Sequence, residues 1–249
     1  HSSHHRRTVP ELMAYKNKQK IVALTAYSAP FARILDKSLD MILVGDSTAM
    51  VGYAMRDTLS ITVEQMTAHG AAVVQSTEQA CVVIDMPFGS FESSVEQAFE
   101  QAAFMLAHSG AAAVKIEGGA ALAETTRFLV QRGIPVLAHV GLMPQYVNTM
   151  GGFKAQGMTD EAAALVERDA LAHQEAGAFA VVLEGVAEPL GRRITRNLSI
   201  PTIGIGASPA CDGQILVTED ILGLSGTRIP RFAQQFADVG AVIEQAVPQ

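Results

Sequence analysis

The stretch GAAAVKIEGG, residues 110–119, is a short apolar run that ends in charged residues and glycine. Runs of this kind recur along the chain, and their continuous apolar character is typical of parallel strands buried on both faces. We expect strands within residues 21–27, 38–47, 79–88, 110–119, 133–142, 177–186, 199–208 and 213–220. Between them we expect helical stretches of about 15 to 25 residues. This alternation predicts an α/β fold, a closed (β/α)8 TIM barrel, with an open doubly wound sheet as the alternative.

The chain has no composition break, linker or low-complexity segment, so we predict a single barrel domain over residues 1–249. Residues 1–19 would be an N-terminal extension of it, and the opening HSSHHRR is left out of the functional argument. Two helices are expected to begin at capping boxes, Thr62 with Gln65 and Ser93 with Glu96. Glycines stand where left-handed helix C-caps belong, at Gly110, Gly133 and Gly177.

The net charge of −7 and the isoelectric point near 5.5 argue against a nucleic-acid partner or an anionic membrane surface. All apolar runs are shorter than the roughly 18 residues that a membrane-spanning helix requires. The two cysteines, Cys81 and Cys211, form no metal or redox motif, and no apolar signal region opens the chain. We therefore expect a globular protein of the cytoplasm.

Ionisable residues stand at the ends of successive strand segments, where (β/α)8 barrels carry their catalytic groups. In chain order they are Asp46, Asp85, Lys115 with Glu117, His139 and Glu184. Neighbouring strands lie about 4.8 Å apart, so carboxylates from the second, third and fourth strands should converge. Converging carboxylates repel one another unless a cation neutralises them. We expect Mg²⁺ there, and disfavour zinc because no Cys or His pair has ligand spacing.

The other strand-end residues each allow two interpretations. Lys115 and Glu117 are two residues apart in a strand and so share one face. Lys115 would hold a substrate carboxylate or stabilise an enolate, or else form a structural ion pair with Glu117. His139 is either a functional residue or a core histidine whose ring nitrogens are hydrogen-bonded. Glu184, on the sixth strand, is a candidate general base.

Other motifs carry less information. The Gly-x-Gly within GIGAS, residues 204–208, precedes a proline where a dinucleotide-binding fingerprint needs its third glycine. The loop MGGFKAQG, residues 150–157, is either a mobile cover or an ordinary loop. His108 and His173 fall in the last turns of expected helices, where a partly positive side chain would complement the helix dipole.

From about residue 20 to about residue 245, the sequence resembles the ketopantoate hydroxymethyltransferase family, whose blocks occur here in the same order. The blocks are MILVGDS, DMPFGS, AVKIEGG, GLMPQ, GGFKAQG, VLEGV, IGIGAS with DGQILV, and the proline and Arg-Phe pair around Arg231. The resemblance implies a (β/α)8 barrel that transfers a hydroxymethyl unit from 5,10-methylenetetrahydrofolate to 3-methyl-2-oxobutanoate. The product would be 2-dehydropantoate (ketopantoate), formed through a magnesium-stabilised enolate in pantothenate and coenzyme A biosynthesis. It also implies a homodecamer.

The resemblance assigns roles residue by residue. It associates one Mg²⁺ per subunit with Asp46, Asp85 and Glu117. It places the 2-oxo acid against Asp46, Ser47, Asp85 and Lys115, and it makes Glu184 the proton acceptor. We add His139 as a catalytic residue from its position at a strand end. The residues that contact the folate are not assigned.

Three residues depart from the family pattern. Thr48 and Ala49 stand where the family commonly has Leu-Gly, which adds bulk beside the expected metal. Ser208 replaces a glycine and is expected to alter a loop that faces the folate.

Two other functions compete with this interpretation. An enzyme of the phosphoenolpyruvate mutase and isocitrate lyase type would carry a KKCGH-like loop, which this chain lacks. A catalytically silent barrel that binds a 2-oxo acid would not require Glu184.

Overall fold

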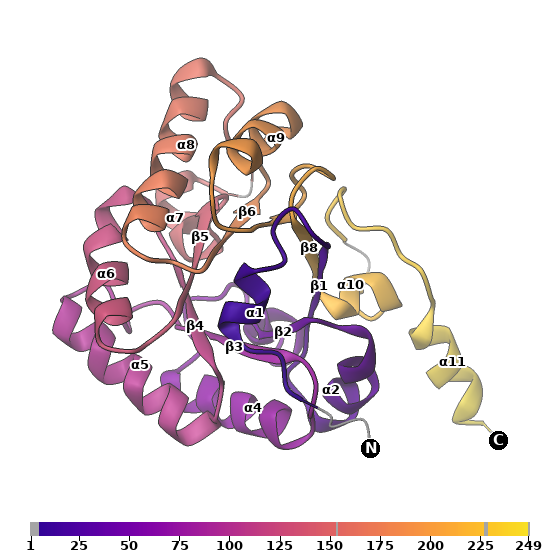
Figure 1. Ribbon diagram of the computed structural model, residues 1–249. Coiled ribbons are helices and arrows are strands. Elements are labelled where there is room, and N and C mark those ends of the chain that lie inside the picture. The colour runs from indigo at the N-terminus through magenta and orange to yellow at the C-terminus, as the bar shows by residue number, and fades with distance from the viewer. Residues whose placement is uncertain (1–4, 153, 227–228, 249) are drawn as a thin grey trace.

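The computed structural model describes residues 5–152, 154–226 and 229–248. Parallel strands form a closed barrel in their order along the chain (Figure 1). They are β1 (Ile21–Thr25), β2 (Met41–Val44), β3 (Cys81–Asp85), β4 (Ala113–Glu117), β5 (Val136–Gly141), β6 (Ala180–Glu184), β7 (Thr202–Ile205) and β8 (Gly213–Leu216). The predicted (β/α)8 barrel is confirmed, and the open doubly wound sheet is excluded.

Helices pack around the outside of the barrel (Figure 1). The longer ones are α4 (Val63–Gln75), α5 (Val95–Ser109), α6 (Ala123–Gln131), α8 (Asp160–Glu175) and α9 (Glu188–Asn197). The shorter ones are α2 (Ala29–Leu35), α3 (Thr48–Val51), α7 (Val147–Met150) and α10 (Thr218–Leu222), with single turns η1 (Asp36–Ser38), η2 (Ala120–Leu122) and η3 (Pro144–Tyr146). After the barrel, α11 (Val239–Ala246) lies at the edge of the molecule (Figure 1). In the part of the chain that the structure describes, no helix has the length and apolar character to cross a membrane.

Most of the expected helix ends are confirmed. Thr62 and Gln65 form the capping box that begins α4. Gly110 ends α5 in the left-handed conformation with φ of 79°, and Gly133 and Gly177 also have positive φ. The second predicted box, Ser93 with Glu96, is wrong by one residue. The N-cap of α5 is the next serine, whose side chain accepts from the backbone N–H three residues later.

Alternate residues of each strand face the barrel interior. On β4, Ala113 belongs to the apolar cluster inside the barrel, whereas Val114 and Ile116 belong to the cluster under the helices. Lys115 and Glu117 continue the interior series, which confirms that they share one face. Apolar side chains therefore fill the amino-terminal part of the barrel, and charged side chains occupy its carboxyl-terminal part.

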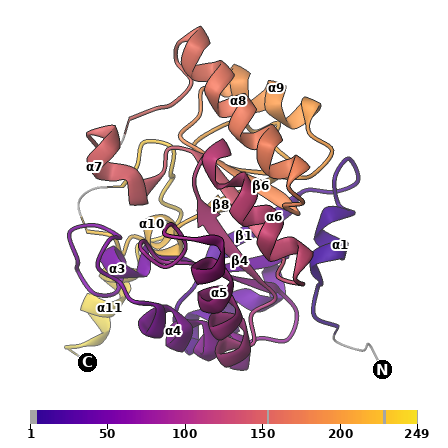
Figure 2. The same ribbon diagram turned by 90° about the vertical axis from the view of Figure 1, so that its left-hand side faces the viewer.

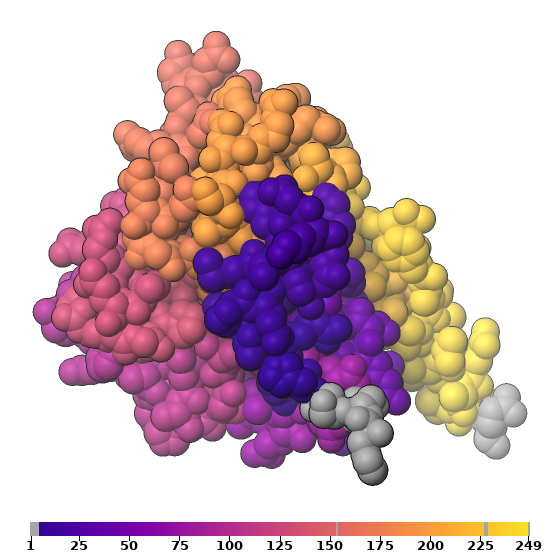
Figure 3. All heavy atoms as spheres, viewed as in Figure 1, coloured from indigo at the N-terminus to yellow at the C-terminus, as the bar shows by residue number. Residues whose placement is uncertain are grey.

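The N-terminal extension covers the amino-terminal end of the barrel. Its helix α1 (Val9–Met13) begins at a capping box between Thr8 and Glu11. Leu12 is 1% exposed and belongs to the apolar cluster of the barrel interior. Figures 1 and 3 show this segment lying across the face of the barrel. The extension thus completes the core.

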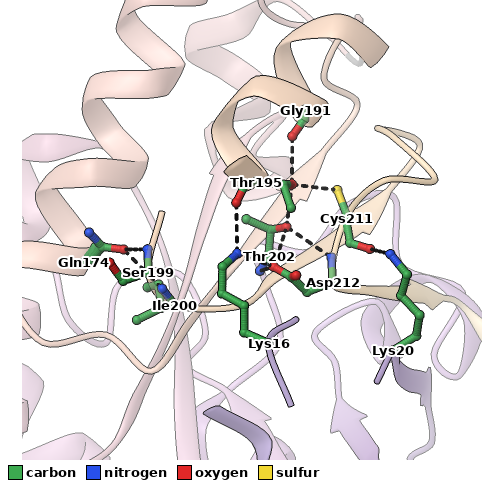
Figure 4. A network of polar contacts seen from close by, with 10 residues as sticks. All are labelled: Lys16, Lys20, Gln174, Gly191, Thr195, Ser199, Ile200, Thr202, Cys211 and Asp212. Carbon is green, nitrogen blue, oxygen red and sulfur yellow. Dashed lines mark hydrogen bonds and ion pairs between the residues drawn. The ribbon is translucent and has the colours of Figure 1, made fainter. Parts of the chain in front are cut away.

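The connection between β7 and β8 differs from the expected strand–helix–strand pattern, because the described residues 206–212 form no helix. The two strands pair in parallel, but a parallel crossover usually takes a dozen or more residues, so this connection is too short to contain a helix. Buried polar contacts join the two strands at their beginnings (Figure 4). Asp212 Oδ2 accepts from the Thr202 backbone N–H at 2.9 Å, and Thr202 Oγ1 contacts Thr195 Oγ1 of α9 at 2.7 Å.

Lys16 connects this network to the N-terminal extension (Figure 4). Its Nζ lies 2.7 Å from Asp212 Oδ2 and donates to the Thr195 carbonyl at 2.9 Å. Both side chains of the ion pair are only 9% exposed. Removing one partner of such a pair leaves the other charge without compensation in a poorly solvated place.

We expect Lys16→Met to lower the free energy of unfolding by about 3 to 5 kcal/mol, because Asp212 keeps its charge and loses its counter-ion. Urea unfolding followed by circular dichroism measures the change. Lys18→Met removes the same charge from an exposed position of the same loop and serves as the control. Equal stability of the two variants would contradict the role assigned to the ion pair.

Candidate active site

Lys115 is the centre of a buried polar cluster at the carboxyl-terminal end of the barrel. Figure 2 shows α3 and α7, which follow β2 and β5, at the opposite end from α1. The strand register pairs Lys115 with Asp85 and Glu117 with His139. The Lys115 Nζ lies 2.8 Å from His139 Nδ1, 3.2 Å from Asp85 Oδ1 and 3.8 Å from Glu117 Oε1. Predicted site residues from three adjacent strands therefore meet around one ammonium group.

Lys115 keeps its positive charge in this place. Burial by itself lowers the pKa of an ammonium group. The surrounding carboxylates, with Asp85 and Glu117 the strongest, together outweigh burial and raise the pKa of Lys115 above its usual value. The side chain is only 4% exposed, so water screens these interactions little. A charged ammonium group is thus available to an anionic ligand.

The carboxylates outnumber this single positive charge. Asp46, just after β2, donates its backbone N–H to Asp85 Oδ2 at 2.9 Å. Burial, and then the charges of Glu117 and Asp85, raise the pKa of Asp46 well above its usual value. Burial also raises the pKa of Glu117, although the Lys115 ammonium group acts in the opposite direction. The cluster therefore favours additional positive charge, from a proton or from a cation.

His139 joins Lys115 to Glu184. Its Nε2 lies 2.8 Å from the Leu142 carbonyl oxygen and 3.1 Å from Glu184 Oε2. A carbonyl oxygen can only accept, so we assign the ring hydrogen to Nε2, and Nδ1 then accepts from the Lys115 ammonium. Glu184 is 16% exposed, more than the other carboxylates of the site. It therefore lies on the open side of the cluster.

Gln145 of η3 belongs to the same cluster, and the sequence analysis missed it. Its backbone N–H donates to Glu117 Oε2 at 3.0 Å, and its side-chain Nε2 donates to Asp46 Oδ2 at 2.8 Å. The search for ionisable residues directly at strand ends passes over a neutral amide four residues beyond β5. The sequence did offer one indication of Gln145, because it ends the block GLMPQ that resembles the family.

The comparison with known families agrees with the resemblance found in the sequence. A family model described as ketopantoate hydroxymethyltransferase matches residues 6–249. The chain belongs to this family. The 3-methyl-2-oxobutanoate hydroxymethyltransferase of Bordetella petrii is 58% identical over 98% of this chain and 89% of its own length. A second such protein, from Pseudomonas aeruginosa, is 57% identical over 99% of this chain and 90% of its own length.

Similar barrels occur among solved structures at much lower identity. One is 2,3-dimethylmalate lyase, a member of the PEP mutase/isocitrate lyase superfamily, with a TM-score of 0.63 and 18% identity over 96% of this chain and 82% of that one. Another is phosphonopyruvate hydrolase in complex with oxalate and Mg²⁺, with a TM-score of 0.65 and 12% identity over 96% of this chain and 85% of that one. At these identities the likeness concerns the fold alone.

The departures from the ketopantoate hydroxymethyltransferase pattern are accommodated locally. Thr48 is 1% exposed, and its hydroxyl donates to the Gly45 carbonyl at 2.6 Å, so its polar atom is used within its own turn. Ala49 is fully buried in the core cluster around β2. Ser208 donates its hydroxyl to Glu188 Oε1 on α9 at 2.9 Å.

The loop 150–157 is attached to the segment that follows Glu184, with Phe153 outside the described residues. The backbone N–H of Gln156 donates to the Gly185 carbonyl at 2.7 Å, and its carbonyl accepts from the Ala187 N–H at 3.1 Å. Gln156 and Val186 thereby form an isolated parallel bridge just beyond the end of β6. The loop therefore lies next to the candidate base.

His173 differs from the expected partly positive helix end. It is fully buried, with Nε2 2.8 Å from the Gly118 carbonyl and Nδ1 3.0 Å from Thr126 Oγ1. Burial lowers the pKa of His173 below its usual value, although the Gly118 and Gly119 carbonyls act in the opposite direction. The neutral ring thus holds the loop that follows Glu117.

Because the pKa of His173 is lower in the folded protein than in the unfolded chain, the unfolded chain binds more protons below the ordinary value of 6.5. The contribution of His173 to the free energy of unfolding is therefore lost as the pH falls below that value. We expect His173→Gln to lose less stability than the parent protein between about pH 7.5 and about pH 5 in urea unfolding. The stability of His108→Gln, changed at an exposed helix end, should depend on pH as that of the parent protein does. If the stability of all three proteins depends on pH in the same way, His173 is not the buried, neutral group assigned here.

Proposed function

We propose that the chain transfers a hydroxymethyl unit from 5,10-methylenetetrahydrofolate to 3-methyl-2-oxobutanoate, giving 2-dehydropantoate in the biosynthesis of pantothenate and coenzyme A. The names of the Bordetella petrii and Pseudomonas aeruginosa relatives support the acceptor and the group that is transferred. The observation that carries the proposal is the line from Lys115 through His139 to Glu184 beside the buried carboxylates. It joins an anion-binding ammonium group to a carboxylate base.

The carboxylates of Asp46, Asp85 and Glu117 fit a hard divalent cation such as Mg²⁺ in charge and donor type. Asp85 Oδ1 is buried and accepts no hydrogen bond, although the Lys115 ammonium lies 3.2 Å away, and like charges help to raise the pKa of Asp46. Among the described residues, no three His, Cys, Asp or Glu side chains already form a metal cage. Mg²⁺ needs none, because it binds through one or two carboxylates together with water and substrate. We assign one Mg²⁺ per subunit to these residues, with Glu117 acting directly or through water.

In this proposal the 2-oxo acid binds against Asp46, Ser47, Asp85 and Lys115. The Lys115 ammonium attracts the anionic oxygens of the substrate, and its partners hold it in one orientation. When bound, the cation supplies further positive charge that stabilises the enolate oxygen. Ser47 is half-buried at the start of α3, and its hydroxyl makes no helix-capping bond.

Glu184 is the proposed proton acceptor. The proton leaves C3 of the substrate for Glu184, and the C–H electron pair becomes the double bond of the enolate. His139 donates its Nε2 hydrogen to the Leu142 carbonyl and lies 3.1 Å from Glu184 Oε2, so it packs against one oxygen of Glu184 and leaves the second to receive the proton. The C3 carbon then bonds to the one-carbon unit of the folate, the two bonds from that carbon to the folate nitrogens break, and water provides the hydroxyl oxygen. The C3 proton and one proton of the water pass to the two nitrogens, so that tetrahydrofolate leaves.

A cytoplasmic homodecamer is also part of the proposal. The assembly rests on the family resemblance, and the exposed apolar side chains of Val242, Ile243 and Val247, on and just after α11, support burial against other copies. The location rests on the free, buried cysteines Cys81 and Cys211. The folate is a co-substrate, and its contact residues are not assigned.

Proton NMR of 3-methyl-2-oxobutanoate in D₂O with the protein and Mg²⁺ tests the function. We expect the C3 proton signal to disappear without folate, and 2-dehydropantoate to form when 5,10-methylenetetrahydrofolate is added. Exchange without product would indicate an enolising enzyme with a different acceptor. Absence of both, in folded protein loaded with Mg²⁺, would leave a barrel that only binds.

Glu184→Gln tests the base. We expect C3 deuterium exchange to slow by about 10² to 10⁴, because an amide cannot accept the proton, whereas the 2-oxo acid should still bind. Exchange is followed by NMR and binding by calorimetry. Glu175→Gln, at the exposed end of α8, is the control. Normal exchange in Glu184→Gln would assign the base to another residue.

A further inference from the structure

Gln145 connects the ends of four consecutive strands. It follows β5, its backbone N–H reaches Glu117 at the end of β4, and its side-chain amide reaches both Asp46 after β2 and the Met86 carbonyl after β3. The distances are 3.0 Å to Glu117 Oε2, 2.8 Å to Asp46 Oδ2 and 3.0 Å to the Met86 oxygen. The residue is 4% exposed. One buried residue thus touches every strand end that supplies a proposed cation ligand, two of them through its side chain and one through its backbone.

The hydrogen bonds follow a common pattern on the three carboxylates. Each has one oxygen bound to an uncharged N–H group: Asp46 Oδ2 to Gln145 Nε2, Asp85 Oδ2 to the Asp46 backbone, and Glu117 Oε2 to the Gln145 backbone. The second oxygens of Asp85 and Glu117 face Lys115. Gln145 supplies two of the three bonds, so it restricts how Asp46 and Glu117 can turn.

The partners also determine the orientation of the Gln145 amide. Asp46 Oδ2 and the Met86 carbonyl are both acceptors, so the NH₂ group must lie between them. The carbonyl Oε1 is then directed elsewhere, and it is buried without a hydrogen-bond partner. A buried acceptor without a donor is costly, and it generally takes its hydrogen bond from an ordered water or from a bound group. Water carried into the site by a cation is a donor that this oxygen can use.

We propose that Gln145 is a positioning residue for the divalent cation, because it holds Asp46 and Glu117 with one oxygen of each available for binding. The inference deepens the proposed function and depends on its cation site. Groups that orient metal ligands through hydrogen bonds typically contribute 10- to 100-fold to metal affinity. The cation itself would contact the carboxylates, and Gln145 acts through them.

The test measures cation binding to the metal-free protein without any turnover. Mn²⁺ is titrated into the parent protein and into Gln145→Met, and free Mn²⁺ is followed by electron paramagnetic resonance. Methionine has a similar length and keeps the backbone N–H to Glu117, but it lacks the NH₂ group and the carbonyl oxygen of the side-chain amide. We expect Mn²⁺ to bind 10- to 100-fold more weakly, and the spectrum of bound Mn²⁺ at saturation to change.

Two further variants make the result decisive. Gln131→Met makes the same replacement at the exposed end of α6 and should bind Mn²⁺ like the parent protein. Gln145→Asn keeps an amide in the core but is too short to span Asp46 and Met86, so it should also bind weakly. Circular dichroism shows which variants fold, and a single folded Gln145 variant is enough to decide.

The possible results separate the two proposals. Parent-like affinity and spectrum in a folded Gln145 variant overturn the positioning role and leave the cation site intact. Failure of both Gln145 variants to fold, with Gln131→Met folded, assigns Gln145 to stability alone. Absence of Mn²⁺ binding in the parent protein overturns the proposed cation site, and the positioning role with it.

Discussion

The site depends on one buried ammonium group among several carboxylates. Lys115 is 4% exposed and contacts Asp85, Glu117 and His139. An unpaired charge in such a place would destabilise the fold, and these contacts therefore constrain the rotamers of all four side chains. The carboxylates still outnumber the ammonium group, so the folded site retains a preference for additional positive charge.

The barrel makes this arrangement possible by separating its interior into two parts. The amino-terminal part is apolar, is completed by Leu12 of the N-terminal extension, and is joined at the β7–β8 seam by the Lys16–Asp212 pair. The carboxyl-terminal part contains the charged cluster and the loops that follow the strands. Stability and chemistry are therefore provided by opposite ends of the same strands, as is usual in this fold.

Neutral groups provide much of the order within the charged cluster. The His139 ring connects Lys115 to Glu184, and the Gln145 amide connects Asp46 to the strands beyond it. His173 holds the loop after Glu117 from the outside through the Gly118 carbonyl. None of these groups adds charge, so they restrict the charged side chains without changing the electrostatic balance of the site.

The amino-acid sequence alone determined the eight strands and the set of ionisable residues at the strand ends, and it favoured the closed barrel over an open doubly wound sheet. These features follow from apolar periodicity and from the adjacency of parallel strands, which are properties of short segments and their order. Only the tertiary structure decided which serine caps α5, how β7 and β8 are joined without a helix, and that His173 is buried and neutral. Only the tertiary structure brought in Gln145. Its partners lie 28, 59 and 99 residues away in the chain, and no local pattern encodes hydrogen bonds between loops that packing alone brings together.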